Sequence, residues 1–269
     1  MNQTRRNFLG TVGAVAAGVA VPRTLSAFAA GQTHKTHIIT LSFDDGFKRS
    51  SILTAEIFEK YKLSACINVI ATGHLKEFQI PDEYQVGIPK GDFELWNQLQ
   101  ARGHEIMPHG FKHANKAKLP LEEAKDLIRR CLVVFKKELK GFDQKTAVFN
   151  FPYNASTPAL EAWLSTQVMA FRTGGGPFNA WPHAGQVKLR TGGSGGPENC
   201  ERKLDREIDA FLAGPSGWFL FNLHGLDHEG WGPIRAEYLD GLLKRLTAIE
   251  TLDLLPAGRA LMKYAARNR

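Results

Sequence analysis

Apolar runs typical of buried strands alternate along the chain with segments in which apolar residues recur at helical spacing. The first run, residues 38–43, is rich in Ile, Leu and Thr, and the segment 50–62 that follows shows a helical stripe. A further apolar run at 63–71 completes a strand–helix–strand unit. More strands are predicted at 105–108, 146–151, 168–172, 187–190, 218–223 and 252–255, and more helices at 93–103, 121–135, 157–164, 204–211 and 234–249.

Two segments, 73–90 and 174–196, lack a sustained period and are predicted to be loops, the second of them around the short strand at 187–190. The glycines of the second segment are not followed by the Lys-Ser/Thr pair of a phosphate-binding loop. Strands that alternate with helices form parallel sheets, and about seven such units suit a closed or nearly closed barrel. We therefore expect an α/β fold with the strands in one barrel.

The N-terminal segment has the features of an export signal. Thr4-Arg-Arg-Asn-Phe-Leu9 precedes a Gly- and Ala-rich run at 10–22, and Ala27-Phe-Ala29 offers small residues for cleavage, a pattern similar to a twin-arginine signal peptide. The apolar run is shorter than the ~20 residues that span a bilayer. We predict a signal peptide at 1–29, a folded domain at 30–269, export to the periplasm or the outside, and no stable membrane association after cleavage.

Charge and cysteine usage narrow the class of protein. Removing Arg5, Arg6 and Arg23 from the 34 basic residues leaves 31 against 27 acidic residues, a net charge of +4. No basic cluster alternates with aromatic residues, so a nucleic-acid partner is not expected. The three cysteines, Cys66, Cys131 and Cys200, are widely spaced; one disulfide is possible, but the first two lie in apolar patterns that favour buried thiols.

Side chains that can bind a metal or transfer a proton follow the predicted strands. Asp44 and Asp45, then His109, then Pro152 and Tyr153, and finally His224 each come directly after the end of a strand. In a parallel barrel these ends form one rim, where active sites are built. Four such strand ends together favour an enzyme over a structural protein.

The pattern predicts a metal site beside a free carboxylate. Asp44 and Asp45 should point to opposite sides of an extended backbone, so that one can bind a metal while the other accepts a proton. His109 and His113 are four residues apart, a spacing that places both imidazoles on one side of a helical turn. With an oxygen from Asp45, these ligands would leave positions open for water and substrate.

The motifs together resemble those of the polysaccharide deacetylases of carbohydrate esterase family four, the NodB-homology domain, over most of the predicted domain. The matching segments, in chain order, are Ser42-Phe-Asp-Asp-Gly46, Gly103-His-Glu-Ile leading to His109 and His113, Phe151-Pro-Tyr153, and Phe221-Asn-Leu-His224. The resemblance implies a distorted (β/α) barrel of about seven units and removal of acetyl groups from N-acetylated sugars. It also implies one divalent metal ion, with zinc favoured and cobalt, nickel or manganese as other candidates.

Matching the motifs residue by residue implies roles for the site residues. Asp44 would be the catalytic base, His224 the acid, and Tyr153 a backbone donor to the oxyanion, while the metal ligands would be Asp45, His109 and His113. Phe151 and Pro152, together with Trp231 on the loop after His224, could offer an apolar face to a sugar ring of an acetylated glycan. Asn150 is a further candidate for binding the substrate.

Two positions depart from the family pattern. The third motif usually has an Arg where this chain has Asn150, and the Asp-Trp pair of the fourth motif has no clear counterpart. Asp44 would then lack a neighbouring cation unless Arg172 or Arg190 takes that place. These departures leave open a hydrolase of non-sugar amides on the same barrel, and an inactive carbohydrate-binding protein remains a third alternative.

Overall fold

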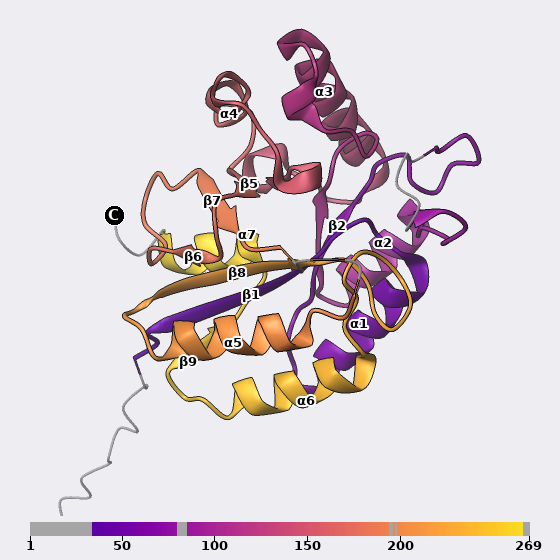
Figure 1. The fold of residues 1–269 in the computed structure, drawn as a ribbon. Helices are drawn as coiled ribbons and strands as arrows, with labels where there is room; N and C mark the ends of the chain where they lie inside the picture. The colour runs from indigo at the N-terminus through magenta and orange to yellow at the C-terminus, as the bar shows by residue number, and fades with distance from the viewer. Residues whose placement is uncertain (1–33, 80–84, 194–195, 197, 266–269) are drawn as a thin grey trace, which may run out of the picture. The chain divides into compact units, whose positions relative to one another are not determined.

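The computed structural model describes residues 34–79, 85–193, 196 and 198–265, so the predicted signal peptide lies outside the described residues. Strands and helices alternate through the described part, as Figure 1 shows. The strands are β1 (His37–Phe43), β2 (Cys66–Val69), β3 (Glu105–Pro108), β4 (Val148–Asn150), β5 (Ala170–Gly174), β6 (Phe178–Asn179), β7 (Lys188–Thr191), β8 (Gly217–Leu223) and β9 (Leu252–Leu254). The helices are α1 (Lys48–Lys60), α2 (Phe93–Ala101), α3 (Leu121–Glu138), α4 (Pro158–Leu164), α5 (Glu201–Leu212), α6 (Ala236–Thr247) and α7 (Ala257–Ala260).

The parallel strands form an incomplete barrel. One sheet has the order β3-β2-β1-β8-β6, with β9 also paired to β1, and a second has the order β4-β5-β7. A parallel bridge between Gly192 and Phe221 joins the end of β7 to β8. Between β3 and β4 no ladder is present in the described ranges, and the contacts there include a hydrogen bond from His109 Nδ1 to the Asn150 carbonyl. The expected α/β fold is confirmed, as a distorted barrel that does not close.

The strands are buried on both faces. Alternate residues of β1, such as Ile39 and Leu41, belong to the larger apolar cluster, which also contains the inner faces of α1, α3, α5 and α6. The intervening residues face the barrel interior, where Ile38 and Trp218 belong to a second cluster that α7 covers at one end. This double burial explains why the strands are nearly continuous apolar runs.

The barrel interior changes character along the strands. On five strands an interior side chain that is apolar, or a thiol, is followed two residues later by a buried polar one, on the same face of the strand. These pairs are Cys66 and Asn68, Val148 and Asn150, Ala170 and Arg172, Leu189 and Thr191, and Leu220 and Asn222. The polar half lies at the carboxyl ends of the strands, where the predicted site residues also are.

One strand and one α-helix, both short, were not predicted. The strand β6 lies in the segment expected to be loop, and it pairs antiparallel with β8. Helix α7 has only four residues, too few for a periodic pattern, and its backbone amides at Gly258 and Arg259 donate to the buried Glu105 carboxylate. This helix closes the apolar end of the interior.

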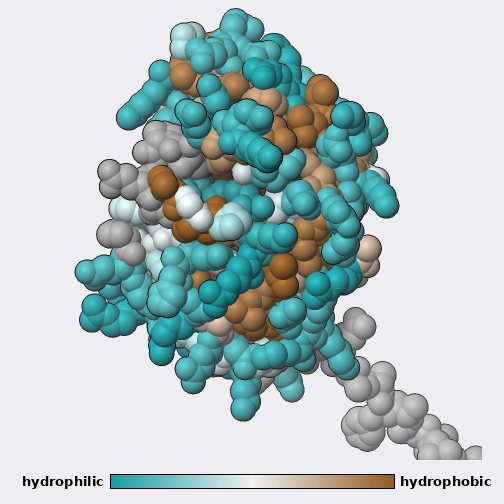
Figure 2. Space-filling model, turned by 90° about the vertical axis from the view of Figure 1, so that its right-hand side faces the viewer, coloured by the Kyte–Doolittle hydropathy of each residue, from teal (hydrophilic) through white to brown (hydrophobic). Residues whose placement is uncertain are grey.

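The surface and the thiols are ordinary for a globular domain. Polar side chains cover most of the face shown in Figure 2, and apolar ones emerge in patches between them. Within the described ranges no helix is both long and apolar enough to cross a membrane. The three cysteines are buried and free, as predicted for Cys66 and Cys131, and burial raises the pKa of the Cys131 thiol to about 12.

Candidate active site

The turn after β1 separates the two carboxylates. The Asp44 backbone amide donates to the Leu223 carbonyl at 2.8 Å and so continues the β1–β8 ladder, whereas Asp45 (φ 73°) and Gly46 (φ 67°) have left-handed backbones. A Cβ on Gly46 would lie 3.1 Å from side-chain atoms of Trp96 and Val69. Both the left-handed backbone and the lack of space therefore favour glycine at this position. Asp44 consequently points into the barrel, and Asp45 points toward the loop after β3.

The carboxylate of Asp45 lies close to both predicted histidines. Its Oδ1 lies 3.5 Å from His109 Nε2 and 3.4 Å from His113 Nε2, and all three residues are buried. Two ligands at about 2.0–2.1 Å from a tetrahedral zinc ion lie roughly 3.4 Å apart. The hydrogen bond between His109 Nδ1 and the Asn150 carbonyl, at 3.0 Å, places the proton on Nδ1 and leaves the Nε2 lone pair for a metal. These residues therefore fit a divalent ion.

The loop that carries the two histidines is irregular, so the prediction of a helical turn was wrong. Residues 109–115 contain no helix and bend at 111–113, and Gly110 has a φ of 95°, which redirects the chain directly after His109. The buried Lys116 lies underneath, and its Nζ would be 2.8 Å from a Cβ at Gly110. Both imidazoles still reach Asp45, through a bend that the His-x-x-x-His spacing did not reveal.

Gln85 supports the carboxylate of Asp45. Its side-chain amide donates to Asp45 Oδ2 at 3.0 Å, and Gln85 is itself buried. Burial alone would raise the pKa of Asp45, but His113 and His109 hold that pKa below its ordinary value. The carboxylate is thus ionised, with Oδ1 facing the two histidines.

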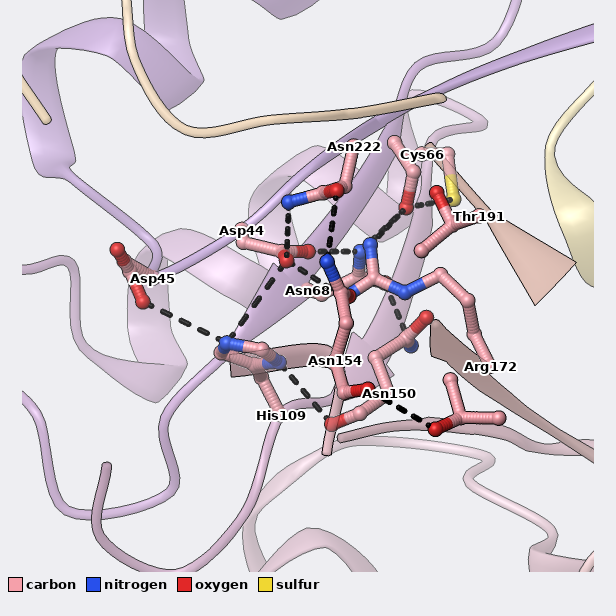
Figure 3. A network of polar contacts seen from close by, with 12 residues as sticks. Asp44, Asp45, Cys66, Asn68, His109, Asn150, Asn154, Arg172, Thr191 and Asn222 are labelled. Carbon is pink, nitrogen blue, oxygen red and sulfur yellow. Dashed lines mark hydrogen bonds and ion pairs between the residues drawn. The ribbon is translucent and has the colours of Figure 1, made fainter. Parts of the chain in front are cut away.

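Asp44 is held through both oxygens by donors from other strands (Figure 3). Asn68 donates to Oδ1 at 2.8 Å, Arg172 donates to Oδ2 at 2.5 Å, and Asn222 reaches Oδ2 at a longer 3.4 Å. Burial opposes ionisation of Asp44, but Arg172 and His109 outweigh it, so the pKa lies below its ordinary value. The result is a buried carboxylate in a fixed orientation.

Arg172, on the strand after that of Asn150, lies against Asp44. Asn150 pairs directly with Arg172 in the β4–β5 register, and the Arg172 side chain is fully buried against Asp44. Asn150 donates to Asn68 Oδ1 at 2.8 Å and is itself only 1% exposed. Asn150 therefore lies behind Asp44 in the buried interior, a position that does not support the expectation that it binds substrate.

The turn after β4 places an exposed aromatic ring beside His113. Tyr153 (φ 58°) has a left-handed backbone, and its ring centroid lies 4.5 Å from that of His113. The apolar face expected here is smaller than predicted, because Phe151 is fully buried in the core and Pro152 is also buried. Tyr153 at 42% exposure and Trp231 at 37% are the candidates that remain accessible to a sugar.

His224 lies at the end of β8 and acts electrostatically on both Asp44 and Asp45. The loop that follows folds back on it, since a Cβ at Gly230 would lie 2.8 Å from the His224 Cβ. Glu229 accepts hydrogen bonds from the Ser50 amide and hydroxyl, which fixes this loop to the start of α1. The predicted acid therefore follows the strand that pairs with β1, at the same edge of the sheet as Asp44.

Comparison with known proteins identifies the family. The sequence model of the family described as polysaccharide deacetylase matches residues 31–172, more than half of the 269-residue chain. The chain belongs to the polysaccharide deacetylase family. No curated protein matches it significantly.

Solved structures share the fold at low identity. A polysaccharide deacetylase from Mycobacterium smegmatis, described only as a putative one, has a TM-score of 0.68 and 12% identity, with 94% of each chain covered. A family 4 acetyl xylan esterase from Clostridium thermocellum, in complex with a cobalt ion, has a TM-score of 0.57 and 15% identity over 84% of this chain and 91% of that one. A peptidoglycan deacetylase from Bacillus subtilis has a TM-score of 0.51 and 15% identity over 84% and 91%.

Proposed function

We propose that this protein is a metal-dependent hydrolase that removes N-acetyl groups from an N-acetylhexosamine-containing polysaccharide or oligosaccharide. The observation that carries the proposal is the meeting of Asp45, His109 and His113 at one point, with the separate carboxylate of Asp44 and the imidazole of His224 beside them. The membership of the deacetylase family supports the same reaction class.

The donor set suits a divalent transition metal. Two imidazoles and one carboxylate are typical of catalytic zinc, and cobalt, nickel or manganese can use the same ligands. When bound, the ion would polarise the acetyl carbonyl and lower the pKa of a water molecule to about 7. The relative from Clostridium thermocellum was solved with cobalt, which agrees with this donor set.

The chain's own groups can then move the protons. Asp44 accepts a proton from the attacking water, and the backbone N–H of Tyr153 donates to the carbonyl oxygen as negative charge develops there. His224 donates a proton to the sugar nitrogen while the carbon–nitrogen bond breaks. The products are acetate and a free amine, and each acid or base role contributes about 10²- to 10⁴-fold.

A panel of acetylated compounds tests the proposal. We expect acetate release from N-acetylglucosamine oligomers or peptidoglycan, loss of activity on chelation, and recovery with added Zn²⁺ or Co²⁺. O-acetylated xylan and a simple N-acetyl amine serve as alternatives, since activity on either alone would change the substrate class. Absence of acetate release from every compound by metal-loaded protein would contradict the proposal and favour a binding role.

We also propose export by the twin-arginine pathway, from the sequence 1–29 alone. Replacing both Arg5 and Arg6 by Lys preserves the charge but removes the arginine pair. The variant should stay in the cytoplasm, as fractionation with immunodetection would show, whereas its normal appearance outside would refute the proposal.

A further inference from the structure

The polar half of the barrel contains a fully buried cation whose position departs from the family motif. Arg172 is on β5, is 0% exposed, and donates through one terminal nitrogen to Asp44 Oδ2 at 2.5 Å and through the other to Ser42 Oγ at 3.2 Å. Its Nε has no hydrogen-bond partner among the described residues. A buried guanidinium is costly unless an anion faces it, and Asp44 is the carboxylate with which it pairs.

The register of the barrel relates this cation to Asn150. Asn150 and Arg172 are directly paired residues of parallel strands, so their side chains leave the sheet on the same face, side by side. Arg172 contacts Asp44 directly, whereas Asn150 acts through Asn68, which donates to Asp44 Oδ1 and to Ser42 Oγ. Arg and Asn thus occupy two adjacent positions behind one carboxylate.

This inference rests on the proposed function. We propose that Arg172 positions the carboxylate of the base Asp44. The family motif usually has an Arg at position 150, and in this chain the Arg is instead on the adjacent strand, at position 172. Arg172 fixes Oδ2 while Asn68 fixes Oδ1, and together they hold the Asp44 carboxylate in one orientation. Arg172 lies behind Asp44 in the buried interior and acts through that carboxylate. It should therefore affect turnover more than substrate affinity.

The central test exchanges the two side chains. Arg172→Met and Arg172→Asn should keep the wild-type metal content, with kcat about 100-fold lower and KM within about threefold. Arg172→Lys should retain part of kcat, because it keeps the charge but not the planar fork. In the double variant Asn150→Arg/Arg172→Asn, kcat should recover at least about tenfold over Arg172→Asn alone. Arg190→Met is the matched control, since Arg190 is on the adjacent strand β7 but donates to the Phe178 carbonyl.

The outcomes separate this proposal from the proposed function. Acetate release by the wild type tests the proposed function, and the ratio of each variant's kcat to the wild-type kcat tests the positioning role of Arg172. A kcat for Arg172→Met within threefold of the wild type, or a folded, metal-loaded exchange variant no better than Arg172→Asn, would overturn the role. If Arg172→Met does not fold, the exchange and Lys variants decide.

A second measurement needs no substrate. In urea unfolding of the metal-free chain, Asp44→Asn and Arg172→Met should each change stability, and the double variant should be less destabilised than the two single effects added together. Additive effects would show that the two side chains do not form a pair, and would overturn the proposal even if every substrate in the panel failed.

Discussion

The two halves of the barrel interior are built from the same strands but have opposite chemistry. Near the amino ends the interior contains Val148, Ala170, Leu189 and Leu220, all 0% exposed, and α7 covers that end. Two residues further along each strand the side chains are Asn, Arg or Thr. Of these, Arg172 and Asn222 donate to Asp44 directly, and Asn150 is connected to it through Asn68. The apolar half should therefore determine stability, and the polar half should determine the geometry of the reaction.

The two halves differ because buried polar side chains need hydrogen-bond partners and buried apolar side chains do not. Buried apolar side chains are stabilised by roughly 25 cal/mol per Å² of apolar surface removed from water, and they need no hydrogen-bond partners. Buried amides and charges need hydrogen bonds, and here each supplies the next: Asn150 donates to Asn68, Asn68 donates to Asp44, and Asn154 donates to Asn222 at 3.0 Å. The polar half is consequently a network in which one substitution affects several groups.

The largest effect is expected for His113→Ala, at the metal site. Two remaining ligands hold a divalent ion poorly, so both metal binding and turnover should be lost. Elemental analysis together with acetate release checks this. A metal-free wild type that keeps full activity after chelation would remove the metal from the mechanism altogether.

Asp44→Asn should separate chemistry from metal binding. The amide cannot accept a proton, so kcat should fall by about 10²- to 10⁴-fold while the metal content stays at the wild-type level. Arg172 would face a neutral side chain, and stability should fall as well. If the variant loses its metal, Asp44 is a ligand and the roles of Asp44 and Asp45 are reversed.

Leu189→Ala tests the apolar half. Leu189 is fully buried, and removing its side chain should reduce the free energy of unfolding by about 2–5 kcal/mol. The folded fraction should keep its kcat and KM, because the cavity forms in the other half of the interior. Leu121→Ala is the control, and because Leu121 is 37% exposed, this substitution should reduce the free energy of unfolding by much less. A large fall in kcat for the folded Leu189 variant would show that the two halves are coupled.

Local patterns predicted more of the fold than of the network. Alternating runs located the strands. The Asp-Asp-Gly turn indicated Asp45, and the His spacing indicated His109 and His113, because each of these signals consists of residues only a few positions apart. The contact between Arg172 and Asp44 joins residues 128 apart in sequence and depends on barrel register, so Arg172 could only be suggested as a candidate. Gln85 lies in a predicted loop with no period, and nothing local marks it as a partner of Asp45.

One sequence signal for the network was present. A polar residue within an apolar strand, two positions after an apolar one on the same face, marks Asn68, Asn150 and Asn222. This pattern predicts which side chains enter the interior near the site. It does not predict which of them contact each other, because that depends on how the strands are staggered.

Lys116 provides the smallest test and a contrast with Arg172. Both cations are buried, at 1% and 0% exposure, but Lys116 Nζ has no carboxylate partner among the described residues and reaches the Ala114 carbonyl at a long 3.4 Å. Burial lowers the pKa of Lys116 from 10.5 to about 8. Below pH 8 the folded protein must hold a charged amine without a counterion, which costs stability.

The sign of the pH dependence follows from this lowered pKa. Between pH 8 and 10.5 the unfolded chain binds the proton more strongly than the folded one, so Lys116 becomes less destabilising as pH rises. Lys116→Met should therefore be more stable than the wild type at pH 7, by on the order of 3 kcal/mol at most, and this advantage should shrink toward pH 10.5. Urea unfolding of both proteins at each pH gives the difference between their free energies of unfolding. In this difference the contributions of the titratable groups that both proteins share cancel. If this difference did not change with pH, or if Lys116→Met were less stable than the wild type at pH 7, the Lys116 cation would be stabilised in the folded protein, as Arg172 is.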